Sequence, residues 1–467
     1  MNSAAPALTA KSFLHKPLRA LAGLLSLRYF VLRASTAAAA IAGGLVQTFV
    51  FARVLDPHDF SIFILIGTFG LSLWLFDLGA AKILYVRQRE RHLTGATGTA
   101  VPAQSSAVVL VYALIVLTGT LICFAAMAAT ASADAARAAE YALFFSFSAL
   151  NLVWFPLRNV SNAIDEFIAF ETLEATRRVG HIGLILALLI GLPMMVCLLL
   201  ANLLWFVLIA ACVTRLVRRN ALVLQITGTL KALTALWRAN RADVLRSGNY
   251  AAAELTIYNF PYLVVPLMFG LGAPTIILDT VFKIFRGATL IYAAGLDPLV
   301  PRQTRAFAEH DAATLKKATL MATVLCAIPT AALCLLLWFA GDRVFALLLG
   351  SAATVPAAAT PILIVLLISN MVQNVASCLL QHTGFFREIA RVATFLVAGM
   401  AAMTGLVYAT GADIVGFIGA YAAVYVVGAV LYVAYVVRKP FRIAAQPLPQ
   451  PPAKCPAPGC ASFRAPL

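Results

Sequence analysis

Charged residues are scarce in this sequence. Only 12% of its 467 residues are Asp, Glu, Lys or Arg, whereas soluble globular proteins carry about 25%. So little charge cannot cover a water-facing surface of this length. The hydrophobic residues, 62% of the chain, instead fall into repeated long blocks. Such blocks are typical of helices that cross a membrane.

The sequence also lacks the motifs of common enzymes and metal sites. It contains no GxxxxGK[ST] or HExxH stretch, and no GxGxxG follows a predicted strand. The eight cysteines include no CxxC pair, and six of them lie in apolar blocks, where cysteine packs as a small apolar residue. Cys455 and Cys460 alone are too few for zinc, which takes four ligands. We therefore expect no cofactor, no metal and no catalytic centre.

The apolar blocks divide the chain into about 12 predicted spans. They lie near residues 30–51, 60–82, 106–129, 140–162, 178–194, 197–216, 248–270, 275–297, 318–340, 359–381, 390–409 and 413–437. We predict an all-α polytopic membrane protein with an N-terminal segment (1–29), a six-helix lobe (30–216), a basic linker (217–247), a second six-helix lobe (248–437) and a Pro-rich disordered tail (438–467).

The positive charges follow this division. Of the 35 lysines and arginines, 28 fall on one predicted side of the membrane together with both termini, and only Arg53, Arg137 and Arg343 fall on the other. Cytoplasmic segments of membrane proteins carry the excess of Lys and Arg. We therefore predict a multi-pass membrane protein with both termini in the cytoplasm. The net charge of +16 is explained by this topology, so no nucleic-acid partner is expected.

The eighth predicted span carries the most informative charges. Asp279, Lys283 and Arg286 recur at i, i+4 and i+7 and so share one helix face. Lys283 lies ~12 Å from the outer end, near the midplane, where a charge costs about 2.5–3.5 kcal/mol on insertion scales. One interpretation is a structural ion pair between Asp279 and Lys283. The other is a polar face along a water-filled pathway, which Arg286 favours because Asp279 can neutralise only one cation.

Other spans contribute weaker candidates. Arg33 and Arg158 lie near the inner ends of the first and fourth spans, where snorkelling to the interface explains them equally well. Glu254 and Asp77 are acidic residues within the seventh and second spans. A polar stripe on the tenth span comprises Asn370, Gln373, Asn374, Ser377 and Gln381. Such amides either hold neighbouring helices together or contact sugar hydroxyls.

Three stretches match a family pattern. FARVLDPHDF at 51–60 is similar to an A-R-x-L-G-P-x-x-[FY]-G turn, and DLG at 77–79 with Arg87 is similar to a D-x-G … R motif. Residues 271–311 follow the order L-G-A, x-V-G-x-[FY], [KR]-I, P, R, D, with Lys283 in the [KR]-I position. Asp56 and Ile277 depart from the pattern, replacing a Gly and a small residue. The chain resembles Wzx-type polysaccharide-repeat flippases of the multidrug/oligosaccharidyl-lipid/polysaccharide exporter superfamily.

The resemblance implies a flippase of the bacterial inner membrane. It would move an undecaprenyl-diphosphate-linked oligosaccharide from the cytoplasmic to the periplasmic leaflet for surface polysaccharide and exopolysaccharide export. It implies two six-helix lobes around a central cavity, alternating access, and membrane lipids and other glycan-assembly proteins as partners. Basic side chains facing that cavity would neutralise the diphosphate. The substrate-binding candidates are Lys283, Arg286, Arg33 and Arg158; the ion-coupling candidates are Asp279, Glu254 and Asp77; the sugar-contact candidates are Asn370, Gln373 and Asn374.

Three alternatives stay open at this stage. A drug or cation antiporter of the same superfamily should line its cavity with acids and aromatics, and the deep cations Lys283 and Arg286 count against it. A membrane polysaccharide polymerase or glycosyltransferase usually has a large outer loop, and the predicted outer loops are short. A structural membrane subunit is compatible with the sequence. Such a role, however, does not require charged residues near the membrane midplane, where they are energetically costly.

Overall fold

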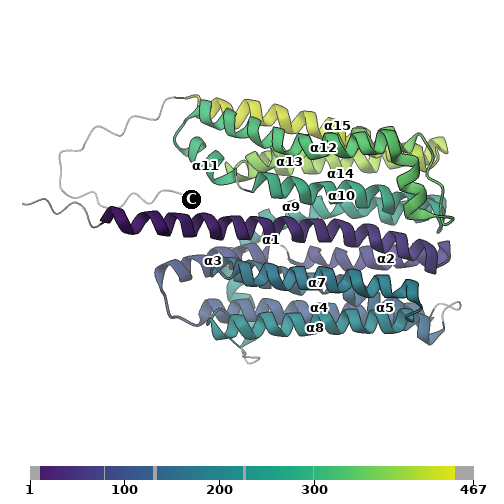
Figure 1. The fold of residues 1–467 in the computed structure, drawn as a ribbon, viewed down its shortest axis with the longest axis horizontal. Helices are drawn as coiled ribbons and strands as arrows, with labels where there is room; N and C mark the ends of the chain where they lie inside the picture. Colours follow the sequence, from purple (N-terminus) through teal and green to yellow (C-terminus); the bar gives the residue numbers. More distant parts are fainter. Residues whose placement is uncertain (1–10, 78, 130–133, 224–227, 298, 447–467) are drawn as a thin grey trace, which may run out of the picture.

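The computed structural model describes residues 11–77, 79–129, 134–223, 228–297 and 299–446. These residues form helices joined by short turns, and no β-strand occurs among them. The long helices run side by side along one axis (Figure 1). The fold class predicted from the sequence, an all-α membrane bundle, is confirmed.

The helices of the first half lie on one side of the bundle (Figure 1). They are α1 (Lys11–Val54), α2 (Pro57–Ser72) extended by the 3₁₀ turn η1 (Leu73–Asp77), α3 (Ala80–Thr94), α4 (Ala100–Ala129), α5 (Ala135–Ala149), α6 (Asn151–Ala163), α7 (Phe167–Ala187) extended by η2 (Leu188–Ile190), and α8 (Met194–Arg218). Helices α5 and α6 follow one another almost without a break and together make one span.

The helices of the second half lie on the other side, and α1 runs between the two groups (Figure 1). They are α9 (Thr229–Phe269), α10 (Ala273–Leu296), α11 (Val300–Ala308), α12 (Ala312–Leu349), α13 (Ala359–His382), α14 (Phe386–Thr410) and α15 (Ile414–Val436), followed by η3 (Val437–Phe441) and α16 (Arg442–Ala444). We call the two groups the N-terminal lobe (α1–α8) and the C-terminal lobe (α9–α16).

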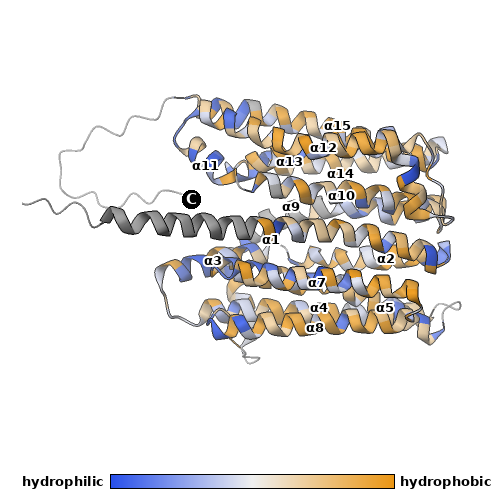
Figure 2. Cartoon of the chain, in the orientation of Figure 1, coloured by the Kyte–Doolittle hydropathy of each residue, from blue (hydrophilic) through white to orange (hydrophobic). Residues whose placement is uncertain are grey.

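Nine helical segments among the described residues are long and apolar enough to cross a membrane. Three further long helices, α7, α9 and α10, run alongside them and carry more charge (Figure 1). Figure 2 shows hydrophilic residues gathered at the two ends of the bundle and on α3 and α11, while hydrophobic residues prevail between. This distribution is expected of a bundle whose middle lies in hydrocarbon.

We name the two ends of the bundle by one residue each. The Asp56 end holds the turns at 55–56, 191–193, 270–272, 350–358 and 411–413. The Asp165 end holds the turns at 164–166, 309–311 and 383–385, together with the connection from α8 to α9.

The helices extend across several of the predicted segment boundaries. Helix α1 begins at Lys11, within the segment predicted to precede the first span. Most of the predicted linker 217–247 is helical, because α9 begins at Thr229 and continues through the seventh span. Helical turns reach Ala444, beyond the predicted start of the tail at 438, whereas 447–467 lie outside the described residues.

The second predicted span, 60–82, ends early, at Asp77. Its carboxylate accepts the backbone N–H groups of Gly79 and Ala81 and the hydroxyl of Tyr112. Gly79 has φ 81°, a left-handed conformation that glycine adopts without steric cost. The chain therefore turns here, and α3 leaves the direction of α2. Asp77 caps this break, and its predicted role in ion coupling stays a prediction.

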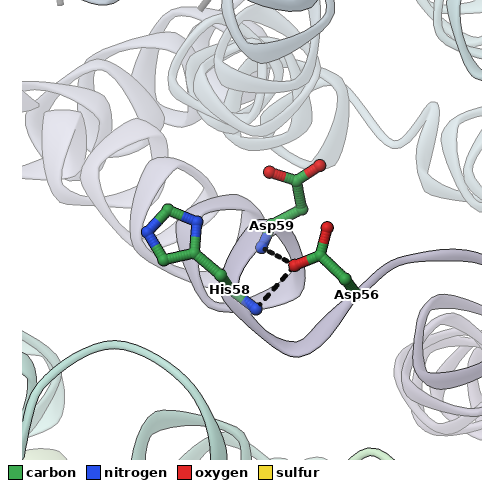
Figure 3. Close-up of side chains that lie close together, drawn as sticks. All are labelled: Asp56, His58 and Asp59. Atoms are coloured by element: carbon green, nitrogen blue, oxygen red, sulfur yellow. Dashed lines mark hydrogen bonds between the residues drawn. The ribbon is translucent and has the colours of Figure 1, made fainter. Parts of the chain in front are cut away.

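The α1–α2 turn shows how Asp56 replaces the glycine of the similar motif. Asp56 is extended (φ −69°, ψ 160°), so glycine is not required, and its side chain accepts the backbone N–H groups of His58 and Asp59 (Figure 3). Asp56 is thus the N-cap of α2, with Pro57 at the first helical position. The three side chains could bring metal-ligand atoms within 4.8 Å of one another. Asp59, however, is bound by Arg137 and Tyr141, so capping and ion pairing explain the cluster.

Candidate functional site

The charged face of α10 contacts α9 within the C-terminal lobe and α1 of the N-terminal lobe. Lys283 Nζ is 2.6 Å from Asp279 Oδ2, which makes the ion pair that the i, i+4 spacing suggested. Asp279 also accepts the Tyr262 hydroxyl at 3.2 Å, and Lys283 donates to Thr48 Oγ1 on α1 at 2.9 Å. Asp279 is 5% exposed, whereas the Lys283 side chain keeps 20% of its surface exposed. Lys283 therefore pairs within its own helix and also joins the two lobes.

Arg286, one turn further along α10, is held by aromatic rings. Its guanidinium lies 4.9 Å from the ring centroid of Tyr262 and 5.8 Å from that of Phe282. It donates to the backbone carbonyl of Tyr258. Among the described residues no carboxylate pairs with Arg286, and its Nε is buried without a hydrogen-bond partner. Ring faces partly offset the cost of burying this charge, and among the described residues the Nε donor has no acceptor.

A second charged group lies at the Asp165 end. Glu171 of α7 accepts Arg33 of α1 at 3.0 Å, and Arg158 of α6 approaches the same carboxylate oxygen at 3.8 Å. Glu171 is 1% exposed, while the two arginine side chains remain 24% and 34% exposed. The structure thus brings together two predicted binding residues from different helices, around a carboxylate that the sequence interpretation missed.

A charged residue of the C-terminal lobe lies near the group formed by Arg33, Arg158 and Glu171. Asp297, at the end of α10, interacts electrostatically with Arg33, Arg158 and His382. Lys82 of α3 lies 5.4 Å from the ring centroid of Phe386 at the start of α14. Among the described side chains on the facing surfaces of the lobes, cations outnumber carboxylates. Such a surface suits an anionic ligand better than a cationic one.

The two groups are separated along α1. Arg33 and Thr48, the partner of Lys283, lie on the same helix, ~22 Å apart at 1.5 Å per residue. That distance is a large part of the ~30 Å hydrocarbon thickness. The cations therefore form two separate groups, one near the middle of the bundle and one near the Asp165 end.

The predicted sugar-contact residues lie inside the C-terminal lobe. Asn370 donates to Thr289 Oγ1 on α10, and Gln373 donates to the Tyr425 carbonyl on α15. Asn374 donates to the side chain of Asn370. These amides line a cavity of about 60 Å³, which is room for about two water molecules. They hold helices together in this conformation, and sugar contact stays a prediction. The side chain of Glu254 lies outside the described residues.

A buried ion cluster supports α7 from within the N-terminal lobe. Glu174 accepts two hydrogen bonds from Arg177, one from Arg178 and one from the Trp154 indole. The Arg177 guanidinium also lies 4.3 Å from the Trp205 ring. The sequence interpretation began the fifth span at 178 and counted Arg177 and Arg178 among the cations of the connection that leads into it. That was wrong, because α7 begins at Phe167. The three-residue spacing of Glu171, Glu174 and Arg177 was the available signal of a helix face.

The fold is that of known membrane transporters. The lipid II flippase MurJ, in an inward closed conformation, matches with a TM-score of 0.63 at 13% identity over 89% of this chain and 90% of its own. A mutant of the Vibrio cholerae MATE transporter VcmN matches with a TM-score of 0.61 at 12% identity over 91% and 99%. A MOP-superfamily transporter from Pyrococcus furiosus, reported to have a binding pocket of reverse polarity, matches with a TM-score of 0.62 at 11% identity over 89% and 95%.

Identities this low show the fold alone. No protein-family model matches the sequence, and no curated protein matches it. The chain has the polytopic fold shared by MATE transporters and the lipid II flippase of the MOP superfamily. Membership of that superfamily, which the sequence motifs predicted, and the Wzx-type assignment within it both stay proposals.

Proposed function

We propose that this protein is a flippase that moves an undecaprenyl-diphosphate-linked oligosaccharide from the cytoplasmic to the periplasmic leaflet by alternating access. The observation that carries the proposal is Arg286, a guanidinium deep in the bundle with no carboxylate partner among the described residues and an unused buried donor. A diphosphate supplies the negative charge and the acceptor oxygens that such a group lacks.

The distribution of charge supports an anionic substrate over a cationic one. Lys283 is matched by Asp279, and Arg33 and Arg158 share Glu171. Arg286 adds a positive charge that no described carboxylate balances. A drug or cation antiporter would have to carry its cation past this surface, at an electrostatic cost.

The proposal includes an orientation. The Asp165 end is placed in the cytoplasm, with both termini, because the predicted loops at that end hold most of the lysines and arginines. Arg33 and Arg158 are then the first cations that a diphosphate meets from the cytoplasmic leaflet, and Lys283 and Arg286 are the next. A substrate delivered to the other leaflet must leave past the Asp56 end.

Direct hydrogen bonds join the lobes at the Asp56 end. Ser61 Oγ accepts the backbone N–H of Gly272 at 2.8 Å, while its own hydroxyl hydrogen is shared between the Pro57 carbonyl at 2.8 Å and the Gly272 carbonyl at 3.1 Å. Arg53 donates to the carbonyls of Leu347 and Leu348 at 2.7 and 3.3 Å. These bonds connect α1 and α2 to α10 and α12, so they must break if the lobes separate here. We infer that this conformation is closed toward the periplasm.

Arg53→Ala is expected to favour opening at the Asp56 end. Loss of a charge-assisted bond should raise the open-to-closed ratio about fivefold. Spin labels at the exposed positions His58 and Thr354 would report this as a larger long-distance population in double electron–electron resonance. Arg137→Ala is the matched control, because Arg137 pairs with Asp59 and Glu140 inside one lobe. Equal distance distributions in both variants would contradict a closing role for Arg53.

A strain lacking the gene tests the function itself. We expect completed lipid-linked oligosaccharide to accumulate on the cytoplasmic side, surface glycan to disappear, and the intact gene to restore it. Unchanged surface glycan with raised drug sensitivity would support the antiporter instead. Loss of glycan without any accumulated completed unit would indicate an earlier biosynthetic step, as for a glycosyltransferase.

A further inference from the structure

A groove opens between α7 and α8 at the Asp165 end, away from the inter-lobe surfaces. Its volume is about 960 Å³. One wall is formed by the turn at Asp165 and Glu166 and by Ile168, Ala169, Thr172 and Leu173 of α7. The other wall is formed by the last turns of α8, from Ala211 onward. The candidate site for the transported substrate uses none of these lining residues.

Helices α7 and α8 lie close together in their middle and leave a groove near the Asp165 end. They are joined by a short turn at the Asp56 end, and at Gly180 a Cβ atom would lie 2.6 Å from Leu204 Cδ2. This close approach fixes the middle of the pair. Toward the Asp165 end the facing residues are short, with Ala169 and Thr172 on one side and Ala211 on the other. Small side chains leave the space between the two helices unfilled.

The groove lies on the outside of the bundle. Thr172, Thr176 and Val179 are exposed along α7, and Phe206 is exposed on α8. The opposite face of α7 holds buried Glu171 and Glu174 and packs on α1 and α6. The exposed face of such a helix meets lipid in a membrane, so an acyl chain can enter the groove from the side.

The rim of the groove is positively charged. Glu166 is bound by both Arg215 and Arg219, at 2.7 and 2.6 Å. Asp165 is bound by Arg89 at 2.7 Å. Arg218 is exposed, and no described residue forms an ion pair with it. Both rim carboxylates are thus already neutralised, which leaves Arg218 as a surplus cation at the end of a membrane-spanning helix.

We propose that this groove binds an anionic phospholipid. Its phosphate would lie on Arg218 and the neighbouring arginines, and one acyl chain would fill the space beside Leu173 and Ala169. Arginine at the ends of spans binds lipid phosphate through charge-assisted hydrogen bonds. A zwitterionic lipid would fill the same volume but would not balance Arg218. This inference does not rest on the proposed flippase activity, because the bound lipid is a partner and not the transported molecule.

Native mass spectrometry of the purified full-length protein tests the proposal. The probes are phosphatidylglycerol and phosphatidylethanolamine of matched acyl chains, titrated in detergent. We expect the wild type to retain phosphatidylglycerol preferentially. Arg218→Gln should weaken that binding about fivefold, which corresponds to about 1 kcal/mol for one basic residue near phosphate. Ala169→Trp should fill the groove and weaken binding of both lipids.

Arg302→Gln is the matched control, because Arg302 is exposed beyond the same end of the bundle but belongs to α11 in the other lobe. It should leave binding unchanged. Equal retention of the two lipids by the wild type would overturn the proposal, as would equal losses in Arg218→Gln and Arg302→Gln. Arg218 is exposed, so its substitution should not impair folding, and an unchanged thermal unfolding midpoint would verify this.

Discussion

Replacing Asp279 by Asn and Lys283 by Gln in the same protein is expected to lower transport at least about tenfold while the protein stays folded. The double variant keeps hydrogen-bonding side chains beside Tyr262 and Thr48 and removes both charges together. It therefore avoids the unpaired buried charge that either single substitution would leave. Surface glycan in a strain lacking the gene, compared at equal membrane expression, is the measurement.

This design separates the two interpretations of the α10 face. If the Asp279–Lys283 pair only holds the bundle together, the neutral pair should be stable and fully active, since buried ion pairs can be replaced without loss. If Lys283 meets the substrate, the variant should be stable and inactive. Arg286→Gln is expected to act in the same direction, because it removes the one deep cation without a described carboxylate partner. Full activity in both variants would refute the assignment.

Glu174→Ala should cause the largest loss of stability, about 3–5 kcal/mol. The substitution leaves Arg177 and Arg178 without their carboxylate, and the Arg177 side chain is only 4% exposed. An arginine cannot release its proton to escape this cost. The thermal unfolding midpoint in detergent is the measurement, with expression level scored in parallel.

Thr176→Ala serves as the control for that substitution. Thr176 is exposed on the same helix, and its hydroxyl only bonds back to the carbonyl of Thr172. It should leave the unfolding midpoint nearly unchanged. An equally small effect of Glu174→Ala would show that water or lipid reaches Arg177 and that the cluster is not a stabilising element.

Hydropathy predicted most of the bundle because the membrane imposes a length and a composition on each span. The α10 face was also predictable, since i, i+4 spacing on a continuous helix places Asp279 and Lys283 together whatever surrounds them. The start of helix α7 was not predictable, because the charged residues within it are typical of a loop unless their ion-pair partners are known. Glu171 and Glu174 are tolerated there only because arginines pair with them.

Contacts between lobes were beyond the reach of the sequence. Nothing local indicates that Lys283 meets Thr48 or that Arg53 reaches the end of α12, because these residues are far apart along the chain. The spacing of the amide residues on α13 predicted that they share one helix face. It did not predict which neighbouring helix that face contacts. Gln373 turns to α15, inside its own lobe. Periodicity shows which residues share a face, and packing decides what that face meets.

Transport by the purified protein in liposomes tests the central claim most directly. The liposomes would carry a fluorescent polyprenyl-diphosphate-linked oligosaccharide, and a membrane-impermeant quencher would report the leaflet that holds it. We expect the wild type to move the lipid between leaflets and the Asp279→Asn, Lys283→Gln variant to leave it in place. Movement of a cationic dye by the wild type, with the lipid-linked oligosaccharide left where it was, would contradict the proposed substrate and the meaning given to Arg286.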